Sequence, residues 1–318
     1  MAITFAGTTT QSPNQNHLAT VYYDRQELSR LTPMFRFYNI GTPRPLPQGS
    51  GKTIQFFRRN VPAYNTNPSA EGVIPAPFTN GTATLTAVVE QFSDYMSTST
   101  MIEDTSITNE VEGMKNDLNI RAAGSIDTIT RLEIDSNSSQ ITDTAGTNLA
   151  ANDLKKRVFT LLGQNVLPYE NTNMVAVTHP YAVYDVVVDT TTGGFIDALK
   201  YQQGQKVLDG EIGMIASCRL LTSTNVGNDG TAAPNTKYNT YIFGKESFGV
   251  VDLAGRGPTG ITDPQNEYLK MNVIKGGPSA TDPTGEIGTY VSYRCVFTAK
   301  TFDKNRFQIP KAKVAIGL

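Results

Sequence analysis

The sequence predicts a mixed α+β fold that extends a long β-hairpin away from its own core. Three observations lead to this fold class. Nine of the seventeen prolines lie before residue 80, one long stretch has helical apolar periodicity, and short strands alternate with Gly/Pro turns over 205–300. At 318 residues, the chain can form one large domain or two smaller ones.

Composition excludes several classes of protein. The formal net charge of −2 gives no basic excess of the kind that a dedicated nucleic-acid binder carries. The two cysteines, Cys218 and Cys295, and the two histidines are too scattered for a zinc site, so we expect two free thiols in a reducing cytoplasm. No positively charged segment precedes an apolar run at the N-terminus, and no apolar run approaches the roughly 20 residues that cross a bilayer. We therefore expect neither a signal peptide nor a membrane span.

The first two segments are an aperiodic stretch and a short helix. Residues 1–20 are polar and aperiodic, which predicts a loose arm. The segment "VYYDRQELSRLTPMF" has apolar residues near helical spacing, and Pro33 limits this helix to three or so turns.

Two strands follow, with β-branched and aromatic residues, at 52–60 and 82–93. The residues between them, "VPAYNTNPSAEGVIPAPFTNG", are dominated by proline, glycine and turn formers. A two-stranded ribbon of this kind is barely stable alone in water. We therefore expect a protruding hairpin that needs another surface to rest on.

The next segment predicts a long helix over about 105–134, with Thr105 near its N-cap. Only one stripe is apolar, so the rod, roughly 40 Å long, should lie across something else. The predicted stripe is Ile107, Val111, Met114, Leu118, Ala122, Ser125, Ile129 and Leu132.

The remaining elements are shorter. "SNSSQITDTAGTN" predicts a loop or short hairpin, and "ANDLKKRVFTLLGQNV" (151–166) an amphipathic helix. "MVAVTHPYAVYDVVV" predicts a strand, a turn at His179-Pro180 and a helix, and irregular strands fill 205–300.

The pentapeptide "GSGKT" at 49–53 matches the end of a nucleotide-binding P-loop. The full pattern requires a glycine where this chain has Leu46, a buried strand before it and a helix after it. Prolines precede it and "TIQFFRRN" follows as a strand. We interpret it as a flexible turn that enters a strand.

No other motif indicates catalysis. "GRGPTG" (255–260) matches a dinucleotide-binding pattern, but Pro264 and a polar run follow it where a helix is required. His179 fits a turn better than a general base, and Glu103 and Asp104 fit a helix start. We therefore predict no catalytic residue, no cofactor site and no metal site.

Two basic clusters occur, and neither has the interleaved aromatic residues of a base-stacking platform. Solvated faces or ion pairs at protein interfaces explain them better, although weak contact with nucleic-acid phosphates is compatible with them. The clusters are Lys52/Arg58/Arg59 and Lys155/Lys156/Arg157.

The order of segments resembles the major capsid proteins of tailed bacteriophages with the Hong Kong 97-type fold, and most closely the podophage-type branch. The resemblance covers most of the chain, and the ordered set of segments carries it rather than any single one. These segments are "YYDRQELSRLTPMFRFYNIGTPRPLPQGSGKTIQFFRR", "AEGVIP", the long helix, "VTHPYAVYDV", "GEIGMIASCRLLTS" and "TYVSYRCVFTAKTFDKNRFQIPKA".

The resemblance implies a domain organisation. It implies an N-terminal arm (1–48), an extended loop (49–95), a peripheral domain with a spine helix (96–170 with 290–318) and an axial domain (171–289). Copies would form hexamers and pentamers, with arms and extended loops lapping over neighbours in an icosahedral shell around double-stranded DNA.

The resemblance also implies partners and a location. The chain begins at the arm without the helical scaffolding region of some relatives, so we expect a separate scaffolding protein. A portal protein would occupy one vertex, and a decoration protein is compatible with the shell. We expect assembly in the host bacterial cytoplasm, a place in the virion capsid and no membrane partner.

Some relatives join their subunits by Lys–Asn isopeptide bonds from a lysine in the extended loop. Here no lysine lies between Lys52 and Lys115, and Lys52 is at the base of the loop. We therefore expect a non-covalent shell.

The leading hypothesis is a self-assembling structural protein and not an enzyme. We predict Lys52, Arg58, Arg59 and Glu71 as inter-subunit polar contacts, from their positions in the ribbon. A nanocompartment shell of the same fold, another virion component such as a tail protein, and a nucleotide-using enzyme remain as alternatives.

Overall fold

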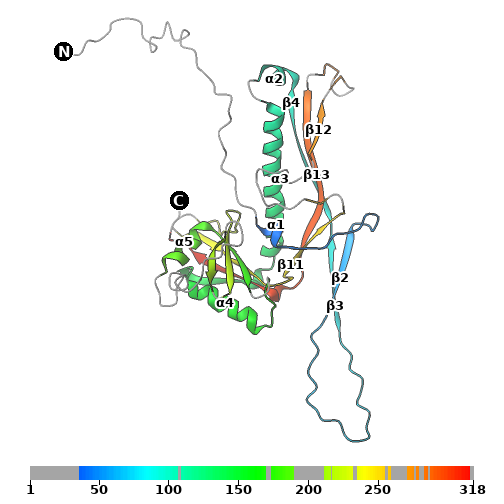
Figure 1. The fold of residues 1–318 in the computed structure, drawn as a ribbon, viewed down its shortest axis with the longest axis vertical. Helices are drawn as coiled ribbons and strands as arrows, with labels where there is room; N and C mark the ends of the chain where they lie inside the picture. The colour runs from blue at the N-terminus through cyan, green and yellow to red at the C-terminus, as the bar shows by residue number, and fades with distance from the viewer. Residues whose placement is uncertain are drawn as a thin grey trace, which may run out of the picture.

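The structure is a computed structural model. It describes residues 36–106, 109–169, 173–189, 211–215, 217–231, 235–254, 257–258, 271–275, 277–278, 283–285 and 287–315. These residues form two sheets with their helices and a separate two-stranded ribbon (Figure 1). The predicted loose arm, the short helix after it and most of "GRGPTG" lie outside the described residues.

The first sheet has five strands and is organised around one long central strand, β13. β4 pairs with β13 along one edge, while β12 and β11 pair in succession along the other edge, and β1 adds in parallel to β11. The strands are β1 (Thr42–Pro43), β4 (Glu90–Ser99), β11 (Phe248–Asp252), β12 (Met271–Lys275) and β13 (Ile287–Thr301).

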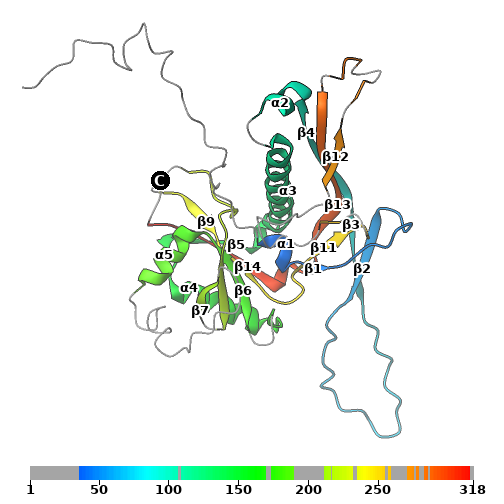
Figure 2. The same cartoon turned by 45° about the horizontal axis from the view of Figure 1, so that its top comes forward.

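The helix α3 (Glu110–Asp135) lies along this sheet, and the short helix α1 (Phe37–Ile40) packs beside it (Figures 1 and 2). Their contact buries a large apolar core between helix and sheet. Its fully buried members include Phe37, Leu118, Ile126 and Phe297.

The second sheet has seven strands in the order β5-β14-β10-β6-β8-β7, and β9 also pairs with β14. The helices α4 (Ala151–Gly163) and α5 (Pro180–Val188) bury their apolar faces on it. The strands are β5 (Ile141–Asn148), β6 (Met174–Thr178), β7 (Glu211–Ile215), β8 (Cys218–Thr222), β9 (Lys237–Asn239), β10 (Tyr241–Phe243) and β14 (Phe307–Lys313).

The ribbon consists of β2 (Thr53–Arg59) and β3 (Thr82–Val88), which pair antiparallel. The predicted first strand is confirmed. The predicted single strand over 82–93 is instead two, because the chain changes partner at Val89: β3 pairs with β2, and β4 pairs with β13. The backbone N–H of Val89 donates to the carbonyl of Lys52 at this crossing, at 2.9 Å.

The prediction of one helix from about residue 105 is wrong at its start. A separate short helix, α2 (Thr100–Thr105), ends at Ser106, and α3 begins at Glu110. Each helix has its own N-cap, because the Ser99 hydroxyl accepts from the N–H of Ile102 and the Asn109 side chain accepts from that of Glu112.

The predicted apolar stripe of the long helix is correct from Val111 to Ala122, and its first residue, Ile107, lies outside the described residues. Met114, Leu118 and Ala122 are buried, but Ser125 and Leu132 are exposed. The buried residues of α3 recur every four residues, which is slightly more than the roughly 3.6 residues of one helical turn. The buried face therefore winds around α3 as the helix crosses the twisted sheet. The buried positions in the second half are Ala123, Ile126, Asp127, Thr130 and Ile134.

The predicted loop or hairpin at 136–148 becomes a 3-10 turn, η2 (Ser138–Gln140), followed by β5, which pairs in parallel with β14. The predicted helix at 151–166 is confirmed as α4. A second 3-10 turn, η3 (Lys304–Arg306), joins the two sheets between β13 and β14.

Both sheets combine segments that are distant in sequence. α4, from the predicted peripheral segment, packs on the seven-stranded sheet, whereas β11 and β12, from the predicted axial segment, belong to the five-stranded sheet. The division into peripheral (96–170 with 290–318) and axial (171–289) domains stays a prediction, because it describes positions in a shell.

Candidate assembly surfaces

Strand alternation gives the ribbon two different faces. Ile54, Phe56 and Arg58 of β2 point towards the body of the protein, while Phe57 on the opposite face is 76% exposed. Ile54 and Phe56 pack against a small core of their own, at the place where the chain passes from β3 of the ribbon into β4. The buried members of this core are Leu46, Ala87, Val89, Val251 and Val296.

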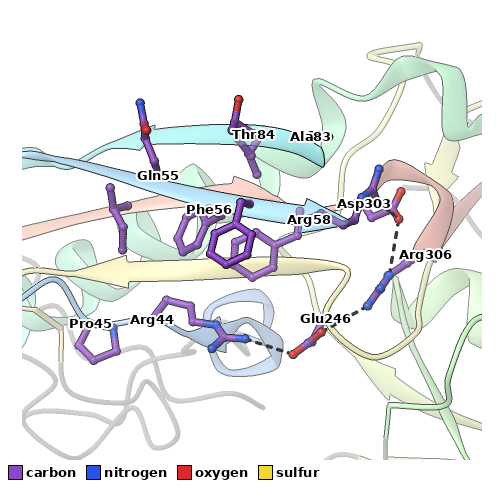
Figure 3. Close-up of a pocket in the computed structure, with 14 residues that line it drawn as sticks. Arg44, Pro45, Gln55, Phe56, Arg58, Ala83, Thr84, Glu246, Asp303 and Arg306 are labelled. Carbon is purple, nitrogen blue, oxygen red and sulfur yellow. Dashed lines mark hydrogen bonds and ion pairs between the residues drawn. The ribbon is translucent and has the colours of Figure 1, made fainter. Parts of the chain in front are cut away.

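Two contacts attach the base of the ribbon to the end of β13. The rings of Phe56 and Phe302 meet edge to face, with centroids 4.9 Å apart, and the guanidinium of Arg58 forms an ion pair with Asp303 (Figure 3). Gly249 on β11 leaves room for the Phe302 ring, since a Cβ at this glycine would lie 2.0 Å from it. The ribbon base is therefore held by its own chain.

The ribbon tip, which we define as residues 60–81, has no such support. One backbone hydrogen bond joins the two ends of the tip, from the N–H of Asn60 to the carbonyl of Gly81. Another closes its turn, from the N–H of Val73 to the carbonyl of Ala70. Every residue of the tip is exposed. Its exposed large apolar side chains are Val61, Tyr64, Val73, Ile74 and Phe78. So much exposed apolar surface on a segment without a core is typical of a protein interface.

The four predicted contact residues fall at three places on the ribbon. Lys52 is exposed at its base, and Glu71 is exposed in the turn of the tip. Arg58 pairs with Asp303 of the same chain, and Arg59 is exposed at the end of β2. Their role in contacts between subunits stays a prediction.

A groove of about 700 Å³ opens between the ribbon base and the body (Figure 3). Three guanidiniums in it share two carboxylates. Arg44 lies 3.1 Å and Arg306 3.4 Å from Glu246, and Arg306 also lies 3.6 Å from Asp303, which pairs with Arg58. The groove lining therefore contains one more guanidinium than carboxylates. The rings of Phe56 and Phe302 form an apolar wall beside these charges.

Sequence reasoning did not find the body side of this groove. Arg58 and Asp303 are 245 positions apart, and no local pattern links "FD" at 302–303 to "QFFRR" at 55–59. The pairing depends on the path of β13, which only the fold reveals.

The junction with the predicted arm is fixed by a buried carboxylate. Asp127 of α3 is fully buried, and its Oδ1 accepts from the backbone N–H of Tyr38 at 3.1 Å. Its Oδ2 accepts from the Asn225 side chain at 2.8 Å. Burial raises the pKa of Asp127 to about 6, although the hydrogen bonds from Asn225 and from the backbone of residues 36–38 oppose this shift.

A further exposed apolar set lies on the seven-stranded side of the molecule. Phe159 and Leu162 of α4 point away from the sheet, and Leu167 follows the helix. Single exposed apolar residues are normal, but these three lie within the short stretch 159–167 and form a second exposed apolar surface of the kind found at protein interfaces.

The P-loop interpretation fails on geometry. Gly49 and Gly51 adopt φ angles of 82° and 77°, which favour glycine, and the strand β2 begins two residues later at Thr53. A phosphate would need the N-terminus of a helix at this point. "GSGKT" is a turn into the ribbon, as the sequence predicts.

The other candidate chemical groups have structural roles. His179 is the N-cap of α5, where its Nδ1 accepts from the N–H of Tyr181, and burial lowers its pKa to about 4. Cys218 and Cys295 are buried free thiols, and burial raises their pKa values to about 12 and about 11.

Within the described ranges, no group of three or more His, Cys, Asp or Glu side chains could hold a metal ion. Among the helices of the same ranges, none has the length and apolar character needed to cross a membrane.

The sequence matches no protein family and no curated protein in our comparisons. Its structure, however, matches solved capsid structures over nearly its whole length. The capsid structure of the cyanophage P-SCSP1u aligns with a TM-score of 0.71 at 14% identity, covering 98% of this chain and 97% of that one. The head structure of Helicobacter pylori bacteriophage KHP40 aligns at 0.67 and 10% identity, covering 99% and 100%.

A shell protein from outside the phages is also similar. The holo-SrpI encapsulin complex from Synechococcus elongatus PCC 7942 aligns with a TM-score of 0.55 at 11% identity, covering 98% of this chain and 99% of that one. The phage capsid chains fit better than this encapsulin chain. The chain therefore has the Hong Kong 97-type α+β fold of tailed-phage major capsid proteins.

Proposed function

We propose that this chain is the major capsid protein of a tailed bacteriophage of the podophage type. Copies self-assemble as hexamers and pentamers into the icosahedral head shell that encloses double-stranded DNA. The observation that carries the proposal is a capsid fold matched from end to end, combined with a ribbon tip whose apolar residues are exposed in the single chain.

The physical properties of the chain suit this role. A shell is stabilised by many weak contacts, and each interface can exceed the roughly 1,600 Å² of a standard protein complex. A net charge of −2 limits electrostatic repulsion between identical copies in a shell. The exposed ribbon and the apolar surface on α4 supply separate contact regions on one subunit.

The proposal includes partners that assembly requires. A separate scaffolding protein directs assembly in the host cytoplasm, a portal protein occupies one vertex, and a decoration protein can bind the finished shell. The packaged DNA makes weak, non-specific contacts with the inner surface. Lys52, Arg58, Arg59 and Glu71 are proposed to lie at subunit contacts.

Expression of the full chain, alone and together with the scaffolding protein of the same phage, tests the proposal. Negative-stain electron microscopy should show closed shells of uniform diameter. Monomers under every condition would contradict it. A denaturing gel of the particles should show single subunits, and a ladder of covalent multimers would contradict the proposed non-covalent shell.

A nanocompartment shell is the second candidate, favoured by the similarity to the encapsulin chain. The two candidates differ in their contents. Particles purified from the natural source should contain double-stranded DNA if the chain is a phage capsid protein, and a cargo enzyme if it forms a nanocompartment. Open tubes in place of closed shells would favour a tail protein.

We also propose that the chain is not an enzyme. An ATP titration followed by calorimetry should show no binding, because "GSGKT" leads into a strand and offers no helix N-terminus. Micromolar binding that Lys52→Ala abolishes would favour the nucleotide-using alternative.

A further inference from the structure

We propose that Asn80 is a site of spontaneous covalent modification, where its side chain cyclises onto the backbone nitrogen of Gly81 and then hydrolyses to aspartate or isoaspartate. Asparagine is among the least durable residues of proteins. The sequence contains this one Asn-Gly pair, and the structure places it at the end of the exposed ribbon tip. The inference concerns the single chain, so it goes beyond the proposed function and does not depend on it.

The reaction balances with water as its co-reactant. The Gly81 nitrogen attacks Cγ of Asn80 and forms a succinimide ring, while its proton leaves with the side-chain amide group as ammonia. Water then adds to one of the two ring carbonyls and opens the ring. Opening at one carbonyl gives aspartate, and opening at the other gives isoaspartate, in which the backbone runs through the side-chain carbon.

The attacking nitrogen is free of competing contacts. Gly81 is exposed and precedes β3, so it lies outside the strand. Within the described ranges its N–H has no hydrogen-bond acceptor, and the carbonyl of Asn60 accepts from Nδ2 of Asn80 instead, at 2.7 Å. Because glycine has no Cβ, the backbone rotates at little cost into the geometry that brings the nitrogen onto Cγ.

The hydrogen bond of Asn80 slows this reaction without preventing it. Its Nδ2 is the leaving group, so the bond to the Asn60 carbonyl must break before ammonia departs. The loss of one exposed hydrogen bond lowers a rate by about tenfold at most. The pair therefore stays reactive in the folded chain.

The other asparagines of the tip are just as exposed, but each lacks a suitable neighbour. A β-branched residue crowds the attacking nitrogen, and proline has no N–H to lose. These pairs are Asn60-Val61, Asn65-Thr66 and Asn67-Pro68.

An Asp-Gly pair elsewhere in the described chain forms the same ring in principle but is held in place. The N–H of Gly230 donates to Oδ1 of Asn228 at 3.2 Å. Oδ1 of Asp229 accepts from the backbone N–H groups of Thr231 and Lys237, at 3.2 and 3.1 Å. Asp229-Gly230 therefore serves as an internal control with both reacting groups engaged.

The modification changes the junction between the ribbon ladder and the tip. It replaces the Nδ2 donor by a carboxylate oxygen that faces the carbonyl of Asn60, and it adds a negative charge to each copy. Isoaspartate also lengthens the backbone beside the hydrogen bond from the N–H of Asn60 to the carbonyl of Gly81, now 3.0 Å long. Hydrogen exchange of the Asn60 amide should therefore quicken in the modified chain.

Peptide mapping by mass spectrometry, on the full unassembled chain incubated at mildly alkaline pH, tests the proposal. Conversion at Asn80 should be at least about tenfold faster than at Asn65 or Asp229. Gly81→Ala should slow it about tenfold. A Cβ at this glycine meets only the flexible amide of Asn60, at 3.0 Å, so this variant keeps the fold.

Hydroxylamine, which attacks a succinimide, supplies a second measurement. It should cut the wild-type chain into fragments 1–80 and 81–318 on a denaturing gel and leave Asn80→Gln intact, because glutamine would have to form a larger ring. Absence of the cut, equal conversion at Asn80 and Asn65, or a rate that Gly81→Ala leaves unchanged would each overturn the inference. Neither measurement needs particles, so these results leave the proposed function untouched, and a chain that is modified at Asn80 but never assembles overturns the proposed function alone.

Discussion

Phe297 on β13 and Phe78 in the ribbon tip are the same side chain in two opposite environments. Phe297 is fully buried between α3 and the five-stranded sheet, whereas Phe78 is 66% exposed. The body buries its apolar residues within one chain, and the tip leaves them exposed. Under the proposed function a neighbouring subunit would cover them, so that folding and assembly would depend on separate regions of the molecule and each could be weakened without the other.

The largest expected effect comes from the same substitution made in both regions. Phe297→Ala should lower the free energy of unfolding of the unassembled chain by about 3–5 kcal/mol, because it leaves a cavity in the core. Phe78→Ala should change it by less than about 0.5 kcal/mol. Chemical denaturation of each variant measures both values.

The yield of assembled particles is the second quantity to compare between the two regions. Phe78→Ala should lower the yield of particles although its chain is as stable as wild type. Equal loss of stability in the two variants would show that the tip is packed within its own chain, and the comparison between body and tip would be wrong.

Local patterns in the sequence predict most of the elements but not their contacts. The strand β2, the helix α4 and the exposed tip follow from side-chain periodicity and proline content, which act over a few residues. Sequence patterns did not predict where α3 begins, because its N-cap Asn109 lies inside the periodic apolar pattern that starts at Ile107, and α2 with its N-cap Ser99 lies before that pattern. Apolar periodicity is judged over many residues, so it does not show a single cap residue that interrupts a helix.

The candidate groove shows what sequence patterns could not predict. Its ribbon side contains Arg58, which we selected from its position in the hairpin. Its body side contains Arg44, Glu246 and Arg306, which come from three other segments. Their proximity follows from the pairing of β1 with β11 and from the turn after β13, and no residue pattern encodes such long-range pairing.

The next largest effect is the pH dependence of stability that comes from the buried carboxylate of Asp127. The folded-state pKa of Asp127, about 6, lies above the usual value for an aspartate, so the folded protein binds this proton more tightly than the unfolded chain. Stability should therefore fall as pH rises from about 4 to above 6, by on the order of 3 kcal/mol. Asp127→Asn should remove this part of the pH dependence.

Denaturation of wild type and Asp127→Asn at several pH values between 4 and 8 measures the difference. The difference in free energy of unfolding between the two proteins should change between about pH 4 and pH 6 and level off above pH 6. A constant gap would show that the buried carboxylate is compensated by its hydrogen bonds from Tyr38 and Asn225.

A pair of glycine substitutions tests the boundary between body and ribbon. Gly249→Ala places a methyl group where the Phe302 ring lies, so it should destabilise the chain by about 1–3 kcal/mol and loosen the ribbon base. Gly113→Ala on α3 meets no atom within 4 Å and should stabilise the helix by up to about 1 kcal/mol.

Hydrogen exchange of β2 and β3 separates the local effect of Gly249→Ala from a global one. Exchange should quicken in the ribbon strands more than in β10 of the seven-stranded sheet. Equal acceleration in both places would show that Phe302 supports the body and does not specifically hold the ribbon.

The smallest expected effect concerns the ion pair at the ribbon base. Arg58 is about half exposed, so solvent and salt screen its attraction to Asp303, and Arg58→Gln should cost only about 0.2–1 kcal/mol in the unassembled chain. Arg59→Gln is the matched control on the opposite face of the same strand and should cost less. The cost of Arg58→Gln should shrink between 50 mM and 1 M salt on denaturation, since an exposed pair is screened at high ionic strength. A cost above about 2 kcal/mol that salt does not reduce would contradict this reasoning, because it would place the ribbon base among the buried parts of the body.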